Sequence, residues 1–276
     1  MASEAFKFSG DDALNYEQYL GPLLFEPSAA EFMSYLDSPD TNNPDPPQTV
    51  LEIASGTGRL TKHLRQYFPA MTTQLIATDI SPDMLELARQ RLKDPSIEFQ
   101  VADAQQLPFN DDSFDLVVCH YGLMFLPDKL KGFSEIFRVL KPGGRFVFST
   151  WDNLDNMPLL DLIFNKLIIP FFRGEDTTRF RVPFSLYEPA ILMDLLQTAG
   201  FSHCGVLPIR FKGSSPSAEN VVNGFFLKHP LARQVAAKDP ASVQPMATDM
   251  QRRIAQQFRN SDLVFDLKAL IGTGSK

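Results

Sequence analysis

The stretch VLEIASGTGRL, from Val50 to Leu60, decides the fold of this chain. Its first part is apolar apart from Glu52, and a buried carboxylate needs partners, which backbone donors or a cation on a ligand supply. Small residues and two glycines, Gly56 and Gly58, follow at once. Glycine lets a backbone approach a ligand closely because it has no Cβ. The pattern predicts a strand, a ligand-binding turn and a helix, which together open a parallel α/β sheet.

The composition narrows the class of protein. The chain has 276 residues, of which 44% are hydrophobic and 21% charged, and a net charge of -7. An acidic chain without a basic stripe disfavours nucleic acid as the main partner. Cys119 and Cys204 are too few for a disulfide framework or a zinc site, so we expect no metal. No secretory leader is visible, and the most apolar segment, Leu159–Phe172, is shorter than the roughly 20 residues of a spanning helix. We therefore expect a cytoplasmic protein without stable membrane insertion.

Three segments are expected along the chain. Residues 1–48 form an N-terminal helical cap that ends in a loop, Asp37–Pro47. Residues 49–151 form the cofactor-binding core, and residues 152–276 supply acceptor-side insertions, a last helix at Pro189–Gly200 and two strands of the same domain. A further helical stretch, Ser217–Phe258, is interrupted at two prolines. The expected strands are Thr49–Ala54, Gln74–Ile80, Ile97–Asp103, Phe114–His120, Arg145–Thr150, Val206–Lys212 and Asp262–Ile271.

Two acidic residues at strand ends suit a nucleoside ligand. Asp79 ends the second strand, 21 positions after Gly58, where a carboxylate can accept hydrogen bonds from ribose hydroxyls. Asp103 ends the third strand and can accept from an adenine amino group, with Ile80 and Leu107 beside the ring. The alternatives are a helix cap for Asp79 and a plain turn for Asp103. A nicotinamide-dependent enzyme would also fit Asp79, but it favours G-x-G-x-x-G, and the third glycine is absent here.

An ordered set of motifs then points to one family. The segments LEIASGTG, ATDIS, VADAQQLPF, FDLVVCHYGLMFLPD and LKPGG follow one another between Val50 and Trp151. Together they resemble the class I S-adenosylmethionine-dependent methyltransferases, in particular the group of ubiquinone/menaquinone-biosynthesis C-methyltransferases. Ala54 stands where the family motif E/D-x-G-x-G-x-G has its first glycine. The N-terminal YEQYLGPLLFEP looks like the cap of stand-alone bacterial members.

The resemblance implies an α/β, Rossmann-like fold. Its seven-stranded sheet has the order 3-2-1-4-5-7-6 with the last strand antiparallel, and it carries helical insertions. It also implies S-adenosyl-L-methionine as cofactor and S-adenosyl-L-homocysteine as product. In the family, the acid at the position of Glu52 organises the cofactor loop near the methionine amine. The cofactor-binding residues implied in this sequence are Tyr16, Tyr19, Glu52, Ala54, Ser55, Gly56, Gly58, Asp79, Ile80, Met84, Asp103, Ala104 and His120.

The resemblance further implies an in-line methyl transfer in which the protein holds the reactants and excludes water. His120 is the candidate general base, or it contributes only backbone groups to the cofactor. Tyr16 and Tyr19 close over the cofactor, or they pack the cap onto the core. An aromatic-rich region after the fifth strand holds the candidate acceptor-binding residues, which otherwise belong to the core. These residues are Trp151, Phe171, Phe172 and Phe225.

The expected partner is a small-molecule acceptor that is partly apolar or aromatic and is methylated at O, N or C. We expect a monomer or a homodimer. Two other functions stay open at this point: a cofactor-binding protein without catalysis on the same fold, and a nicotinamide-dependent oxidoreductase.

Overall fold

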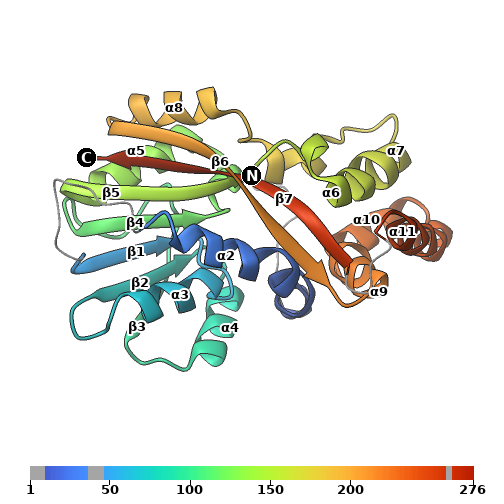
Figure 1. Cartoon of the computed structure of the whole chain (residues 1–276), viewed down its shortest axis with the longest axis horizontal. Coiled ribbons are helices and arrows are strands. Elements are labelled where there is room, and N and C mark those ends of the chain that lie inside the picture. The colour runs from blue at the N-terminus through green and yellow to red at the C-terminus, as the bar shows by residue number, and fades with distance from the viewer. Residues whose placement is uncertain (1–9, 37–46, 259–262) are drawn as a thin grey trace.

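A seven-stranded sheet forms the centre of the protein (Figure 1). The computed structural model describes residues 10–36, 47–258 and 263–276. The strand order is β3-β2-β1-β4-β5-β7-β6, and β7 runs antiparallel to both of its neighbours, so the predicted fold class is confirmed. The strands are β1 (Thr49–Ile53), β2 (Gln74–Asp79), β3 (Ile97–Val101), β4 (Phe114–His120), β5 (Leu140–Trp151), β6 (Ser202–Ser215) and β7 (Leu263–Ser275).

Four helices pack along the sheet: α3 (Arg59–Tyr67), α4 (Pro82–Leu92), α5 (Lys129–Val139) and α8 (Pro189–Thr198). The strand β4 between them is buried from Leu116 to Cys119, which explains its near-continuous apolar sequence. Helix α4 begins where the sequence predicts a cap, because the Ser81 hydroxyl accepts the Met84 N–H at 3.3 Å and proline takes the first helical position.

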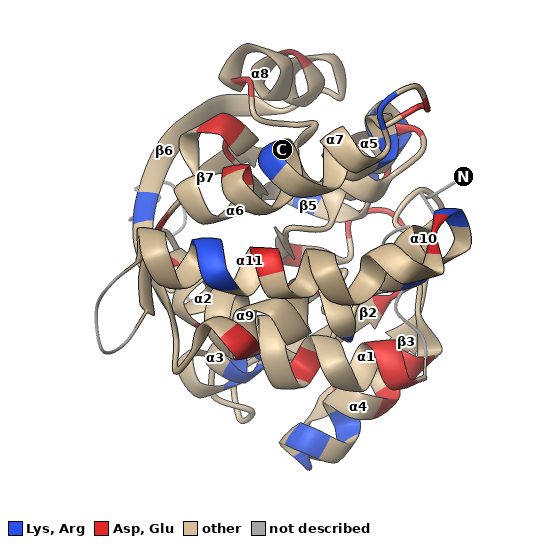
Figure 2. Cartoon of the chain, turned by 90° about the vertical axis from the view of Figure 1, so that its right-hand side faces the viewer, with Lys and Arg blue, Asp and Glu red and all other residues tan. Residues whose placement is uncertain are grey.

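A second group of helices gathers at one end of the sheet, at the right of Figure 1. It contains α6 (Pro158–Ile163), α7 (Ile169–Phe171), α9 (Ala218–Val222), α10 (Pro230–Lys238) and α11 (Val243–Gln257). Short helices lie between and beside them: η4 (Leu154–Asn156), η5 (Phe164–Ile168), η6 (Thr178–Phe184), η7 (Asn223–Leu227) and η8 (Pro240–Ser242). The breaks predicted before Pro230 and Pro240 are present. Figure 2 looks onto this end, where residues of both charges are interspersed over the helices.

The three C-terminal strands of the sheet are longer than the sequence pattern predicts. Strands β6 and β7 pair with each other from Ser202↔Ser275 to Ser215↔Leu263, so both strands continue past their predicted ends. Strand β5 already begins at Leu140, which pairs with Phe114 before a register shift leads to Arg145. Backbone pairing lengthens these strands, and periodicity does not report such pairing. Most of the predicted loop, residues 37–46, and Asp262 lie outside the described residues.

The described part of the N-terminal segment is helical, and we call residues 10–33 the cap. It contains α1 (Asp11–Asn15), η2 (Tyr16–Phe25), which is wound with π-helical turns, and α2 (Glu26–Met33). Helix α2 contacts α3, and η2 contacts β6 and the short helix η7 (Asn223–Leu227). The cap therefore bridges the core and the helical end. The division into three segments stays a prediction.

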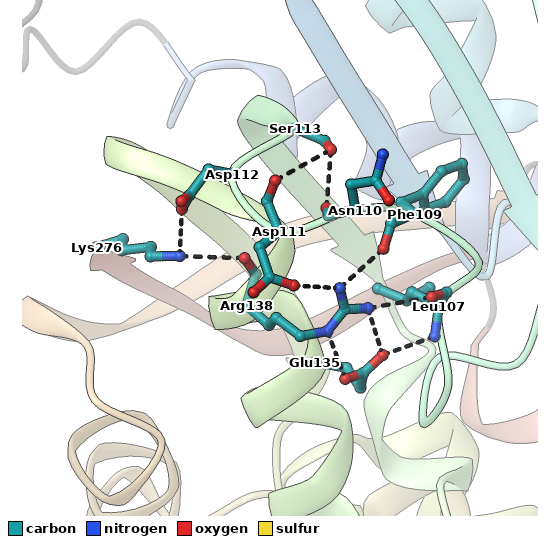
Figure 3. Close-up of polar contacts among 9 residues, drawn as sticks. All are labelled: Leu107, Phe109, Asn110, Asp111, Asp112, Ser113, Glu135, Arg138 and Lys276. Atoms are coloured by element: carbon teal, nitrogen blue, oxygen red, sulfur yellow. Dashed lines mark hydrogen bonds and ion pairs between the residues drawn. The ribbon is translucent and has the colours of Figure 1, made fainter.

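A polar cluster around Arg138 joins α5 to the loop before β4 and to the C-terminus (Figure 3). The Arg138 guanidinium donates to the carbonyl oxygens of Leu107 and Phe109 at 3.1 and 2.8 Å, and to both oxygens of Glu135 at 2.8 Å. The nearby Lys276 ammonium donates to the Arg138 carbonyl oxygen at 3.1 Å. These contacts hold the loop after β3 against α5.

Replacing Arg138 with alanine is expected to lower the free energy of unfolding by about 2–3 kcal/mol, because two loop carbonyls and the Glu135 carboxylate lose a charged partner. Urea unfolding at pH 7 measures this loss. Arg252→Ala is the matched control, since the exposed Arg252 side chain donates to Asp249 and Gln256 of its own helix, and it should stay within about 0.5 kcal/mol. Equal effects of the two substitutions would contradict the stabilising role of the Arg138 cluster.

Candidate functional site

A cavity lies between the cap and the turn that follows β1. It is lined by Tyr16 and Phe25 of the cap, by Glu52, Ala54, Ser55, Gly56, Thr57, Arg59 and Leu60, and by His120 at the end of β4. Six of the sequence-predicted site residues therefore meet in one cavity. They come from η2, β1, the turn and β4, because parallel strands place their carboxyl ends at the same edge of the sheet.

Backbone conformation shapes the turn. Gly56 and Gly58 have φ of 56° and 78°, which is the left-handed region that favours glycine. Ala54 has φ of 55°, so this position also adopts the conformation that a glycine would take in the family motif. A Cβ on Gly122 would lie 2.4 Å from the Ala54 Cβ. The loop after β4 is thus kept small enough to accept the alanine.

Glu52 is the most unusual group in the cavity. Its side chain is buried, at 1% exposed, and within the described residues its Oε2 atom has no hydrogen-bond partner. Burial, with a smaller contribution from the nearby Asp79, raises the pKa of Glu52 to about 8, although Thr61 and Arg91 act to lower it. The Ser55 hydroxyl beside it likewise has no partner in the described part of the chain. Together with Arg59 Nε, these atoms give the described cavity wall three buried polar atoms without a partner.

Asp79 holds the turn against the start of α4. Its Oδ2 accepts the Gly56 N–H and its Oδ1 accepts the Ser81 N–H, both at 2.8 Å. Burial raises the pKa of Asp79, and the backbone donors at Ser81 and Gly56 oppose that rise. Because Ser81 caps α4, Asp79 is not the cap itself. A carboxylate has about four acceptor sites, so it can accept further hydrogen bonds from a ligand.

His120 faces the cap through a short chain of hydrogen bonds. Its Nε2 lies 3.0 Å from the Ser28 hydroxyl, which lies 2.6 Å from the Tyr121 hydroxyl. Burial lowers the pKa of His120 to about 3, so the imidazole is neutral at pH 7. A neutral imidazole can accept a hydrogen bond, but it is a weak base.

Ion pairs from the cap close one side of the cavity. Glu17 contacts Arg59 at 2.6 Å and the Thr57 hydroxyl at 2.5 Å, and Glu26 contacts Arg59 at 2.8 Å. The sequence analysis did not single out Arg59, Thr57, Phe25 or Leu60. No local pattern marks Arg59, because its two acidic partners lie 42 and 33 positions earlier.

The remaining predicted cofactor residues lie outside the cavity. Asp103 accepts the Gln105 N–H at 2.8 Å, as a turn residue does, and Ile80 is 69% exposed beyond β2. Tyr19 packs beside Gly224 of η7. The others are Gly58 at the start of α3, the buried Met84 of α4 and the buried Ala104 that follows Asp103.

The four predicted acceptor residues lie in two places. Trp151 is 5% exposed and stacks on Tyr121, with ring centroids 4.0 Å apart, and it also lies edge-on to Phe25 of the cavity. Phe225 is buried against Phe164. Phe171 and Phe172 lie at the end of α7, where Phe172 lines an open groove beside Arg179 and Lys238. Of the four, Trp151 contacts the cavity wall through Phe25.

The described residues contain neither a cluster of metal-binding side chains nor a helix suited to span a membrane. Residues 10–36, 47–258 and 263–276 contain no group of three or more His, Cys, Asp or Glu placed to hold a metal ion. The same ranges contain no helix with the length and hydropathy of a membrane span.

Comparison with known proteins finds a family that matches the core of this chain. Residues 51–148 match the family model described as "Methyltransferase domain". Demethylmenaquinone methyltransferase of Deinococcus radiodurans is 42% identical over 103 residues, which are 37% of this chain and 42% of that protein. The ubiquinone/menaquinone biosynthesis C-methyltransferase of Escherichia coli is 36% identical over 140 residues, or 49% of this chain and 50% of that protein. The matches therefore span half or less of these curated relatives.

Solved structures agree on the fold over nearly the whole chain. Phosphoethanolamine N-methyltransferase 2 of Haemonchus contortus, solved with S-adenosyl-L-methionine, superposes with a TM-score of 0.59 at 17% identity, covering 97% of this chain and 57% of that one. A suspected methyltransferase of Bacillus halodurans superposes with a TM-score of 0.55 at 18% identity, covering 90% and 98%. At this identity the likeness shows the class I methyltransferase fold alone.

Proposed function

We propose that this protein transfers a methyl group from S-adenosyl-L-methionine to a small, uncharged acceptor with an apolar or aromatic ring. The observation that carries the proposal is the pair of buried, unpartnered polar atoms, Glu52 Oε2 and Ser55 Oγ, in the described wall of the cavity of a methyltransferase domain. An orphaned buried polar atom in a native protein calls for a partner, and the amino-acid end of the cofactor supplies one.

The residues present fit this cofactor along the edge of the sheet. Glu52 would face its ammonium group, and Arg59, which also lines the cavity, its carboxylate. Asp79 has acceptor sites left for ribose hydroxyls. Asp103 would accept from the adenine amino group, and the exposed Ile80 would cover one face of the ring.

The bound cofactor supplies an electrophilic methyl group on sulfur. The chain then has to hold the acceptor in line with that group and keep water out. Tyr16 and Phe25 stack with centroids 4.9 Å apart and form the cap side of the cavity, where they would exclude water. Glu52 would ionise beside the cationic ligand and release its proton, because an opposite charge favours the ionised form.

The aromatic rings that continue from the cavity wall to Trp151 favour an uncharged acceptor. The ring of Tyr16 contacts that of Phe25, Phe25 contacts Tyr121, and Tyr121 contacts Trp151. None of these side chains carries a charge at pH 7. His120 beside them is neutral. A phosphorylated or ammonium acceptor would lose its hydration there without gaining a counterion, whereas a phenol or hydroquinone ring would stack. The quinone-pathway names of the curated relatives support this acceptor class.

Two experiments test the proposal. Isothermal titration with S-adenosyl-L-methionine, S-adenosyl-L-homocysteine and NAD in parallel should give micromolar binding of the first two and none of NAD. A screen with methyl-labelled S-adenosyl-L-methionine should then label hydroquinones and phenols but not phosphoethanolamine. Binding of NAD alone would overturn the cofactor assignment, and binding of the cofactor without any turnover would favour a non-catalytic protein.

A further inference from the structure

We propose that Ser28, in the cap, is a positioning residue that fixes the ring of His120 through Nε2, so that Nδ1 is the nitrogen that meets the acceptor. This inference deepens the proposed function and rests on it. It makes the cap a part of the acceptor site, because helix α2 supplies the hydroxyl that orients a residue of the core.

The contacts that carry the inference are buried and short. Ser28 is 1% exposed, and its hydroxyl lies 3.0 Å from His120 Nε2 and 2.6 Å from the Tyr121 hydroxyl. Both distances are normal for hydrogen bonds. The His120 ring also lies edge-on to Phe32, the next inward-facing aromatic residue of α2, with centroids 5.3 Å apart. Helix α2 therefore holds the imidazole at two points.

Tyr121 fixes the Ser28 hydroxyl in turn. Its ring is stacked on Trp151 with an angle of 6° between the planes, and its backbone has φ of 57°. Ring stacking and an uncommon backbone conformation leave the phenol little freedom. The chain Tyr121–Ser28–His120 is thus anchored at the end that lies away from the cavity.

The hydrogen-bonded chain Tyr121–Ser28–His120 allows two arrangements of its hydrogen atoms. In one, the Tyr121 hydroxyl donates to Ser28, Ser28 donates to Nε2, and Nδ1 carries the ring proton. In the other, Nε2–H donates to Ser28, Ser28 donates to the Tyr121 oxygen, and Nδ1 has a free lone pair. The second arrangement suits an acceptor that bears a hydroxyl, because Nδ1 then accepts its hydrogen bond.

The position of the cap determines whether Ser28 can join His120 and Tyr121 by hydrogen bonds. Glu26, two residues before Ser28, contacts Arg59 and His63 of α3 at 2.8 and 3.1 Å. These contacts hold the start of α2 against the core. The orientation of His120 therefore depends on the packing of α2 against the core.

The first test needs neither cofactor nor acceptor, so its failure is distinct from failure of the proposed function. Nitrogen-15 NMR of the full chain labelled at histidine reports the tautomer of His120. The wild type should show one fixed tautomer, with Nε2 protonated. In Ser28→Ala the separation between the two ring-nitrogen shifts should fall at least twofold, and Tyr121→Phe, which keeps the stacked ring, should give part of that change. Ser34→Ala, an exposed serine just after the same helix, is the matched control.

The second test uses a hydroquinone acceptor. Ser28→Ala should lower kcat about tenfold and change KM for S-adenosyl-L-methionine less than threefold, and Ser28→Thr should restore most of the activity. A lower melting temperature with an unchanged His120 tautomer would show that Ser28 only packs the cap, and would overturn the inference. An Nδ1-protonated imidazole in the wild type would also overturn it.

Discussion

Replacing Asp79 with alanine is expected to weaken binding of S-adenosyl-L-methionine by about 10- to 150-fold. The carboxylate is a charged acceptor, and the loss of hydrogen bonds to such a group costs roughly 1.5–3 kcal/mol. It also anchors the turn, because it accepts the N–H groups of Gly56 and Ser81 at 2.8 Å. The substitution therefore removes direct contacts with the ribose and loosens the loop that shapes the cavity.

Isothermal titration of the folded variant measures this effect, with thermal unfolding recorded beside it. Asp79→Asn keeps the shape and one acceptor oxygen, so its loss of affinity should be smaller than that of the alanine variant. Asp266→Ala serves as the matched control, since Asp266 pairs with Lys212 on the exposed surface of β7. An unchanged dissociation constant in folded Asp79→Ala would remove the ribose assignment.

The parts of the fold that the sequence predicts best are those fixed by local patterns. Strand β4 matches its predicted bounds because a strand covered on both faces is apolar over most of its length. Strands β6 and β7 exceed their predicted bounds because their ends depend on pairing with each other, and the outer residues of β6 alternate between exposed and buried.

The same distinction applies to the site. The turn after β1 could be predicted because glycines and a buried acid leave a local signature in the sequence. The ion pair of Glu17 with Arg59, and the contact of Ser28 with His120, join residues 42 and 92 positions apart. Pairing across such distances depends on how the cap folds back onto the sheet. Trp151 was predicted to bind the acceptor, but its stack on Tyr121 was not, because ring geometry has no sequence pattern.

Replacing Glu52 with glutamine is expected to stabilise the protein at neutral and mildly alkaline pH. Burial raises the pKa of Glu52 from 4.5 to about 8 in the folded chain. The folded state therefore holds a proton that the unfolded state has released between these pH values. Stability from this group is fully present below about pH 4.5 and is lost as the pH rises through 8, by up to about 5 kcal/mol. Asp79 adds negative charge beside Glu52, whereas Arg91 and Thr61 limit the shift.

Urea unfolding of the wild type and of Glu52→Gln at pH 5, 6, 7 and 8 tests this expectation. The difference in unfolding free energy between the two proteins should grow with pH in favour of glutamine, because the amide cannot ionise. A difference that stays constant over this range would mean that Glu52 is already ionised in the folded chain. Saturation with S-adenosyl-L-methionine should reverse the order, since the cationic ligand favours the carboxylate that glutamine lacks. The destabilising acid of the ligand-free protein then becomes the group that binds the ligand.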